Sequence, residues 1–504
     1  MRAPSSIREN PCRGGPDLAG TTGDDGGDKD KGARTPRGPQ MPLTHPKDPR
    51  VARLNLSSNP IFVQEGSTPI PRDELPAGSM DPDLAYQIIH DELLLDGNAR
   101  LNLATFVSTW MEPQAQRLYA ETYDKNMIDK DEYPQTAELE IRCVNILARL
   151  FHAPKAAEAT GCSTTGSSEA AMLGGLALKR RWQHRRRARG KPAERPNMVM
   201  GVNAQVCWEK FCNYWDVEVR QVPMEGDRFH ISADEAVKLC DENTIGVLAI
   251  MGSTYDGSYE PVKEICQALD VLQARTGLDV PVHVDAASGG MVAPFLDPEL
   301  EWDFRLRRVA SINVSGHKYG LVYPGVGWIV WRDAEALPED LIFRVNYLGG
   351  SMPTFALNFS RPGAQIVLQY YNFLRLGFAG YAKVQRYSRE VAVRLAGEIE
   401  KLGDFELLTR GDELPVFAFR LKDEVKNYTV FDVSRALREY GWTVPAYTFP
   451  KRREDLAALR IVVRHGFTHD LADILIADIR RQLPRLQAQP MPRHGASSGT
   501  GFSH

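Results

Sequence analysis

The chain lacks three features that would connect it to a membrane, to nucleic acid or to an oxidising compartment. Its 504 residues contain neither an apolar run near the roughly 18 residues of a membrane span nor a hydrophobic signal core. The formal net charge of -4 leaves no polybasic field. Seven cysteines are scattered without CxxC spacing, which argues against disulfides or a zinc site. We therefore expect a cytoplasmic protein without a metal, nucleic-acid or membrane partner.

Large apolar side chains are also scarce at both ends of the chain. The first 40 residues contain eight Gly and five Pro among charged residues, and such a segment cannot bury enough surface to offset its ordering entropy. We predict a disordered N-terminal extension over 1–55 and an N-terminal helical segment over 56–100, with a helix from about Leu84 to Gly97. The Gly/Ser/Pro-rich residues 486–504 are expected to form a flexible tail.

Between residues 197 and 332, short apolar runs alternate with helical stretches. Predicted strands lie at 197–202, 217–223, 245–251, 280–287, 310–316 and 326–332. Among the helices between them, one follows Ser232, whose spacing to Glu235 is typical of a capping box, and another covers 260–276. This alternation predicts an α/β fold with a mainly parallel sheet covered by helices on both faces.

The C-terminal third predicts a second domain. A long helix around 363–378 begins the connection, and strands at 405–409, 416–422 and 460–464 follow, with helices near 429–440 and 469–483. We assign 101–388 to a large domain and 389–485 to a smaller α+β C-terminal domain.

Two residues at strand ends carry the clearest chemical signal. Lys318, in SGHKYG, follows an apolar strand, where burial would favour a neutral amine able to form a Schiff base. The alternative is an exposed lysine in a turn. Asp285, in HVDAASGG, ends another strand and could pair with a protonated ring nitrogen of a cofactor. The alternative is a carboxylate that only caps the strand end.

A third motif, TGSSEAAMLGGLALKRRW, begins with small polar residues and continues as a helix. Ser167 and Ser168, with the N–H groups of the first turn, could bind a phosphate. The basic run that follows, KRRWQHRRRARGK, is better explained as a solvated helix C-terminus than as a nucleic-acid site. A phosphate helix, then an aspartate, then a lysine is the order found in fold-type I pyridoxal-phosphate (PLP) enzymes.

Longer motifs between about residues 81 and 483 resemble bacterial and plant glutamate decarboxylases. They include NLATF, IDKDEYPQ, TGSSEAAMLGG, QVCWEKF, HVDAASGG, SGHKYG and NYLGGSMPTFALNFSRP. The resemblance implies a fold-type I PLP-dependent transferase-like fold with a seven-stranded sheet, and α-decarboxylation of L-glutamate to 4-aminobutyrate. It also implies a homo-oligomer, with a dimer as the minimal active unit and a hexamer as a larger candidate. Rival hypotheses are a decarboxylase of aspartate or of an aromatic amino acid, and a non-catalytic PLP-binding scaffold.

The resemblance also assigns residues. It gives the cofactor Lys318, Asp285, Ser167, Ser168, Gln205, Thr254, Ala287, Ser315 and His317, with Ser360 contributed by the neighbouring subunit. It gives the substrate Thr105, Phe106, Asp129 and Arg460, and places Tyr347 on a mobile loop that reaches a neighbouring active site as a candidate proton donor. From the residues themselves, Arg460 could instead form a structural salt bridge and Asp129 could cap a helix.

The end of the chain differs from the plant enzymes. No basic amphipathic helix with a tryptophan follows Lys451, so calmodulin is not expected as a partner. The final GFSH resembles the Phe-x-His ending of acid-responsive bacterial homologues. We therefore expect that His504, when neutral, could close the active site.

Overall fold

The computed structural model describes residues 72–346 and 352–489. They fall into two units, Met1–Asp91, described from residue 72, and Glu92–His504. The predicted extension over 1–55, Tyr347, His504 and most of the predicted tail lie outside the described residues. Helix α2, Pro82–Leu93, ends before the predicted Gly97. Within the described ranges, every helix is too short or too polar to cross a membrane. The predicted domain limits stay predictions.

A seven-stranded sheet forms the centre of the second unit, in the order β1-β7-β6-β5-β4-β2-β3. Its strands are β1 Thr160–Thr164, β2 Asn197–Gly201, β3 Glu218–Val222, β4 Thr244–Ile250, β5 Val282–Asp285, β6 Val309–Ser315 and β7 Gly327–Trp331. The five adjacent strands β6, β5, β4, β2 and β3 are parallel to one another, whereas β7 is antiparallel to both β6 and β1. The predicted mainly parallel seven-stranded sheet is therefore confirmed. Strand β1 escaped the sequence prediction because TGCST has no apolar pattern.

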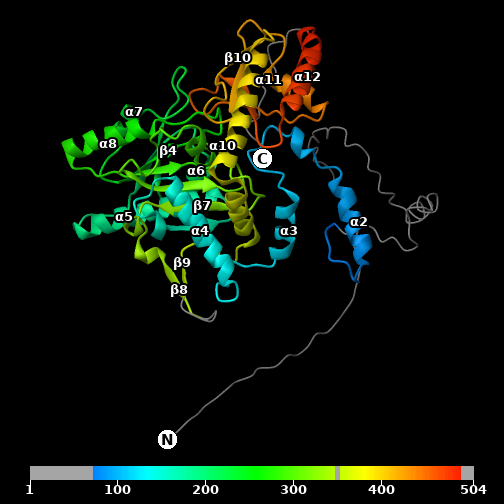
Figure 1. Cartoon of the computed structure of the whole chain (residues 1–504). Helices are drawn as coiled ribbons and strands as arrows, with labels where there is room; N and C mark the ends of the chain where they lie inside the picture. Colours follow the sequence, from blue (N-terminus) through cyan, green and yellow to red (C-terminus); the bar gives the residue numbers. More distant parts are fainter. Residues whose placement is uncertain (1–71, 347–351, 490–504) are drawn as a thin grey trace, which may run out of the picture. The chain divides into compact units, whose positions relative to one another are not determined.

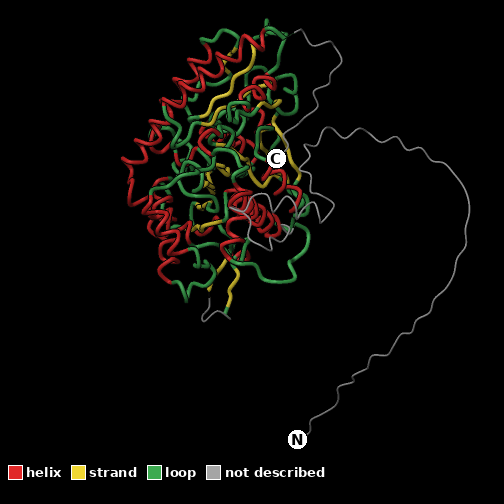
Figure 2. The backbone as a smooth tube through the Cα atoms, turned by 90° about the vertical axis from the view of Figure 1, so that its right-hand side faces the viewer, coloured by secondary structure: helices red, strands yellow, loops and turns green. Residues whose placement is uncertain are grey.

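Helices cover both faces of this sheet, as Figure 1 shows. In Figure 2, the view from the side, most strands lie in the interior with helices around them. They are α3 Pro113–Thr122, α4 Pro134–Leu150, α5 Ser167–Ala188, α6 Val206–Tyr214, α7 Ala233–Lys238, α8 Val262–Thr276 and α9 Ala293–Leu296. Strand β4 shows the two-sided burial. Its Val247 packs in the cluster that contains α8, and the next residue, Leu248, packs in the cluster that contains α5 and α6. This explains why the central strands are apolar throughout.

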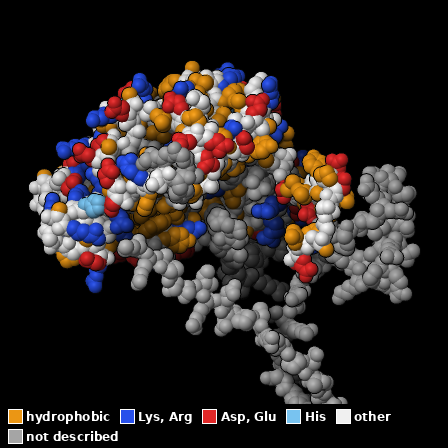
Figure 3. All heavy atoms as spheres, turned by 90° about the horizontal axis from the view of Figure 1, so that it is seen from below, with side chains coloured by type: hydrophobic (Ala, Val, Ile, Leu, Met, Phe, Trp, Pro, Cys, Tyr) orange, Lys and Arg blue, Asp and Glu red, His pale blue; other side chains and the backbone are white. Residues whose placement is uncertain are grey.

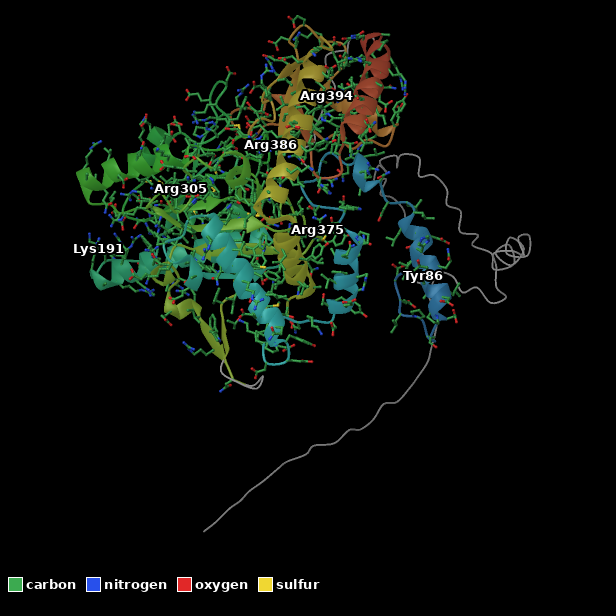
Figure 4. All side chains as sticks on the ribbon, viewed as in Figure 1. Tyr86, Lys191, Arg305, Arg375, Arg386 and Arg394 are labelled. Atoms are coloured by element: carbon green, nitrogen blue, oxygen red, sulfur yellow. The ribbon has the colours of Figure 1, made fainter. Side chains whose placement is uncertain are left out.

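Helix α10, Ala364–Glu400, connects this sheet to a second, smaller one. It is kinked at Gly377, where φ is 56°. Arg375, Arg386 and Arg394 mark its course in Figure 4. Arg375 pairs with Glu112 at 2.9 Å, just before α3, and Arg394 pairs with Asp473 on the last helix. These ion pairs connect the two halves of α10, before and after the kink, to neighbouring parts of the fold.

The smaller sheet is antiparallel, in the order β10-β11-β13-β12. It comprises β10 Phe405–Leu407, β11 Val416–Leu421, β12 Ala446–Thr448 and β13 Ala457–Val462, and it packs with α11 Val430–Arg438 and α12 His469–Gln487. A separate hairpin, β8 Phe343–Val345 and β9 Met352–Thr354, projects at the lower edge of Figure 1.

One local prediction is wrong. Ser232 precedes α7, but its side chain caps no N–H group there, and Glu235 instead accepts a hydrogen bond from Arg228 at 2.9 Å. Because Arg228 binds the Glu235 carboxylate, that carboxylate does not accept a hydrogen bond from the N–H of Ser232 and the capping box is not formed. A complete capping box occurs at α11, where Thr429 Oγ1 accepts from the N–H of Asp432 at 3.3 Å and Asp432 accepts from the N–H of Thr429 at 2.9 Å.

We expect Thr429→Ala to lower the free energy of unfolding by about 1 kcal/mol, because the N–H of Asp432 in the first turn of α11 loses its side-chain acceptor. Ser232→Ala is the matched control and should change stability much less, since Ser232 makes no capping bond. Urea unfolding followed by circular dichroism measures both. Equal losses for the two variants would contradict the capping assignment.

Candidate active site

A cavity of about 670 Å³ opens beyond the carboxyl ends of β4, β5 and β6. Ligand sites in open α/β sheets commonly lie at this edge. The cavity is lined by most of the residues that the sequence resemblance assigned: Thr105, Phe106, Ser167, Ser168, Gln205, Thr254, Asp285, Ala287, His317, Lys318 and Arg460. The structure thus brings together residues that lie up to 355 positions apart in the chain, Thr105 and Arg460.

Asp285, the last residue of β5, is a buried carboxylate held by three neutral donors. Its Oδ2 accepts from Trp208 Nε1 at 2.8 Å. Its Oδ1 accepts from Asn313 Nδ2 at 2.9 Å and from the N–H of Ala287 at 3.1 Å. Only 6% of the residue is exposed, and no lysine or arginine of the described chain forms an ion pair with it. A buried, unneutralised carboxylate at a cavity wall is suited to a cationic ligand atom.

His283 supports this network through Asn313, one of the donors to Asp285. Its Nε2 lies 2.7 Å from Asn313 Oδ1, and its Nδ1 lies 2.7 Å from Ser311 Oγ. Burial lowers the pKa of His283 to about 4, so the ring is neutral at ordinary pH. Because Asn313 uses its amide nitrogen toward Asp285, its oxygen must accept the Nε2–H of His283, and Ser311 then donates to Nδ1.

Lys318 and Arg460 both lie close to one aromatic ring. Lys318 Nζ is 5.4 Å from the ring centre of Phe106, and the guanidinium carbon of Arg460 is 5.0 Å from the same centre. Burial lowers the pKa of Lys318, which favours the neutral amine, while the Asp285 charge opposes that shift. The alternative of a fully exposed turn lysine is therefore excluded.

Arg460 lies on β13 and is 3% exposed. Its guanidinium donates to the carbonyl oxygen of Thr254 and, at 2.7 Å, to that of Ala104, while Nε has no partner in the described structure. Its pKa is lowered by burial, and only tyrosines act against that shift. No carboxylate of the described residues pairs with it, so the alternative of a structural salt bridge finds no partner there.

The start of α5 borders the cavity with small polar groups. No side chain caps this end of the helix, and Ser167 Oγ accepts from Ser315 Oγ at 2.7 Å. Ser315 thus lies behind Ser167 rather than in the cavity wall. The ring of His317 lies close to Gly166, since a Cβ added to that glycine would be 3.1 Å from His317 Cε1. Burial lowers the pKa of His317 to about 4, so this ring too is neutral.

Segment 99–109, which we call the strap, connects the smaller sheet to the lysine loop. The Val462 N–H donates to the Leu103 carbonyl at 2.9 Å, which joins the strap to β13. At its other end Ser108 donates from Oγ to the Lys318 carbonyl and from N–H to the His317 carbonyl, both at 2.7 Å. The strap therefore carries Thr105 and Phe106 into the cavity and fixes the backbone of Lys318.

Two assigned residues lie together outside the cavity lining. The N–H of Asp129 donates to the carbonyl of Asn126 at 3.1 Å, and Asn126 Nδ2 donates to Ser360 Oγ at 3.3 Å. Helix α4 begins at Pro134 with Tyr133 before it, so Asp129 does not cap that helix. Tyr347 lies outside the described residues.

Sequence reasoning missed the residues that support the site. Trp208, His283 and Asn313 were not assigned, although the first two stand in the quoted motifs QVCWEKF and HVDAASGG. Their polar atoms are buried in apolar stretches, and that is the signal that could have found them. Asn203 and Cys207, which also line the cavity, carried no separate signal.

A parallel sheet with a serine-rich helix start, an aspartate ending β5 and a lysine beyond β6 defines the class of fold-type I PLP-dependent enzymes. Comparisons with known proteins agree. Residues 76–422 match the pyridoxal-dependent decarboxylase conserved domain. The chain therefore belongs to the pyridoxal-dependent decarboxylase family, whose cofactor is pyridoxal phosphate.

Relatives and solved structures narrow this family. The chain is 56% identical to a glutamate decarboxylase of Aliivibrio fischeri over 92% of this chain and 100% of that protein. It is 53% identical to one of Solanum lycopersicum over 85% of each chain. A solved glutamate decarboxylase of Lactobacillus brevis superposes with a TM-score of 0.81 at 47% identity, covering 84% of this chain and 97% of that one. A tryptophan decarboxylase of Catharanthus roseus, at 16% identity and a TM-score of 0.68, shares the fold.

We expect Trp208→Phe to destabilise the protein by about 1–3 kcal/mol more than Trp331→Phe, because only Trp208 donates to the buried carboxylate of Asp285. Trp331 is a matched control, since it is 1% exposed and its Nε1 has no partner in the described structure. Urea unfolding gives both free energies. If the two variants lost the same stability, the Trp208 hydrogen bond would contribute nothing.

Proposed function

We propose that the chain removes the α-carboxyl group of L-glutamate, which yields 4-aminobutyrate and carbon dioxide. The observation that carries this proposal is Arg460, a buried guanidinium at the cavity wall with an unpartnered Nε and no acidic partner in the described structure. Such a cation favours a carboxylate ligand. The relatives named glutamate decarboxylases, which match nearly the whole chain, supply the particular substrate.

The residues present fit pyridoxal phosphate. The uncompensated carboxylate of Asp285 suits the protonated ring nitrogen, and the first turn of α5 with Ser167, Ser168 and His317 suits the phosphate. The backbone is closely packed at that helix start, because a Cβ on Gly327 would lie 2.4 Å from the carbonyl carbon of Gly166. Gln205, Thr254 and Ala287 complete the cofactor set, with Ser315 behind Ser167 and Ser360 from a second subunit.

The cofactor, when bound, supplies an electron-poor ring that accepts the electron pair left by departing carbon dioxide. The protein residues prepare this step. Asp285 would keep the ring nitrogen charged, and the lowered pKa of Lys318 leaves a neutral amine that can bind the cofactor. Once the substrate's amine has taken its place, Lys318 could return to the α-carbon a proton that it has accepted from the substrate's ammonium group. Arg460 holds a substrate carboxylate. Tyr347 is a second candidate proton donor.

Thr105 and Phe106 line the part of the cavity formed by the strap, and they are our candidates for the distal carboxylate pocket. Asp129 is the third member of that pocket and would act from a second subunit. Two carboxylates repel, so binding beside Asp129 requires that one of them is protonated. Turnover should therefore be favoured by acid.

A dimer is the proposed minimal active unit. Asn358, two residues before Ser360, donates to the cavity residue Glu169 from its N–H at 3.2 Å, so this segment already lies at the cavity mouth. Phe343, Leu357 and Phe359 are exposed nearby in sequence, at 66%, 42% and 44%. Figure 3 shows apolar side chains gathered on the face seen from below, the side where β8 and β9 project in Figure 1. We infer that a second copy of the chain covers this face. The enzyme is proposed to act in the cytoplasm and without a calmodulin partner.

Product analysis over a panel of amino acids tests the function. The purified protein loaded with pyridoxal phosphate should convert L-glutamate to 4-aminobutyrate, and aspartate and aromatic amino acids should react far more slowly. Arg460→Gln should reduce kcat/KM by about a hundredfold, because a charge-assisted pair contributes roughly 2–3 kcal/mol. Preferred turnover of another amino acid would identify a different decarboxylase, and no turnover of any would identify a PLP-binding scaffold.

Subunit complementation tests the dimer. Lys318→Ala and Ser360→Asp should each inactivate the enzyme, the latter because a carboxylate there would repel the phosphate. If Ser360 acts on the neighbouring subunit, co-expression restores one complete site in each mixed dimer, or about a quarter of all sites with random pairing. If mixed dimers stay inactive although mass spectrometry shows that they form, Ser360 acts within its own subunit or not at all.

A further inference from the structure

A second pocket, of about 370 Å³, is partly lined by residues from both ends of the strap. It is lined by Ala99, Arg100, Leu103, Thr109, Trp110, Arg464, His465, Gly466, Phe467 and Thr468. None of these residues lines the active-site cavity. Three of them can carry positive charge, and none is acidic.

Arg464 repeats the features of Arg460 four residues later in the chain. It is 7% exposed, it donates to Thr109 Oγ1 at 2.9 Å and to the carbonyls of Ala99 and Asn102 at 2.7 and 2.8 Å, and its Nε has no partner in the described structure. Burial lowers the pKa of Arg464, and only the nearby Tyr319 acts against that shift. As for Arg460, every acceptor is neutral.

A buried guanidinium without an acid is costly unless an anion joins it. One carboxylate acts on this pocket: burial lowers the pKa of His465, and the negative charge of Glu112 opposes that shift. Glu112 is already engaged, because it accepts from Tyr371 at 2.6 Å and from Arg375 at 3.0 Å. Positive charge in the pocket is therefore not neutralised by the described residues.

The remaining walls are apolar and flat. Trp110 is 51% exposed, and its ring centre lies 5.2 Å from that of His465. Leu103 and Phe467 are buried in the same lining. A bare inorganic anion would leave most of this volume unfilled, whereas an anion attached to a small planar group would cover the exposed indole.

We propose that this pocket binds a small organic oxyanion, a carboxylate or a phosphate ester, with the oxyanion against Arg464 and Arg100 and its apolar part against Trp110. The ligand would contact the strap at Arg100 and Leu103, next to Thr105 and Phe106, which line the active-site cavity. The site is independent of which amino acid the enzyme decarboxylates.

Calorimetric titration of the cofactor-loaded enzyme with benzoate, phenyl phosphate and inorganic phosphate tests the proposal. Arg460→Gln is used as the background, because it removes the cation of the active-site cavity. At least one of the two aromatic anions should bind this variant saturably, and more tightly than inorganic phosphate. The preferred one tells whether the oxyanion is a carboxylate or a phosphate ester.

Adding Arg464→Gln or Arg100→Gln should weaken that binding about tenfold or more, because each removes a charged hydrogen-bond donor. Arg386→Gln, an exposed arginine on α10 (Figure 4), is the charge-matched control and should have no effect. Arg100 is exposed, so its variant remains informative if Arg464→Gln misfolds. Absence of saturable binding below about 10 mM, or binding unchanged by both pocket variants, would overturn the proposal.

Discussion

The buried carboxylate of Asp285 is the constraint on which the rest of the site depends. A carboxylate with 6% exposure and no ion pair among the described residues is tolerable because three neutral donors hold it, and those donors come from helix α6, strand β6 and the loop after β5. Trp208 requires α6 to pack against the end of β5, and Asn313 requires β6 beside β5. The parallel order of the strands is thus what makes the carboxylate possible, and its remaining charge defines what the cavity can bind.

The strap adds a second level of organisation. The smaller sheet supplies Arg460 from β13, and the large sheet supplies Lys318 from the loop beyond β6. Hydrogen bonds from Arg460 to Ala104 and from Ser108 to Lys318 connect both to the same short segment. The ring centre of Phe106 lies 5.4 Å from Lys318 Nζ and 5.0 Å from the guanidinium carbon of Arg460. Five strap residues, 104–108, thus connect the small sheet to the lysine loop, and neighbouring strap residues line the proposed anion pocket at Arg464.

The sequence predicted what depends on local pattern. Apolar strands, the strand-end position of Asp285 and the helix start at Ser167 are readable because strand and helix periodicities are local. The short polar strand β1 is not, since only its pairing with β7 makes it a strand. The capping box expected at Ser232 failed because Arg228, in the turn before the helix, competes for Glu235. Family resemblance located most cavity residues, but Trp208, Asn313 and His283 act through contacts between elements. Asp129 and Ser360 lie outside the lining of this cavity, and their roles stay predictions.

The central claim is that one lysine, opposite the Asp285 carboxylate, holds the cofactor by a covalent bond. Borohydride reduction of the cofactor-loaded protein fixes that bond permanently, and peptide mass spectrometry then locates the modified lysine. The account predicts the pyridoxyl group on Lys318, with loss of the label in Lys318→Ala and retention of it in Lys179→Ala, a lysine of α5 outside the cavity lining. A label on a different lysine, or an equal distribution over surface lysines, would contradict it.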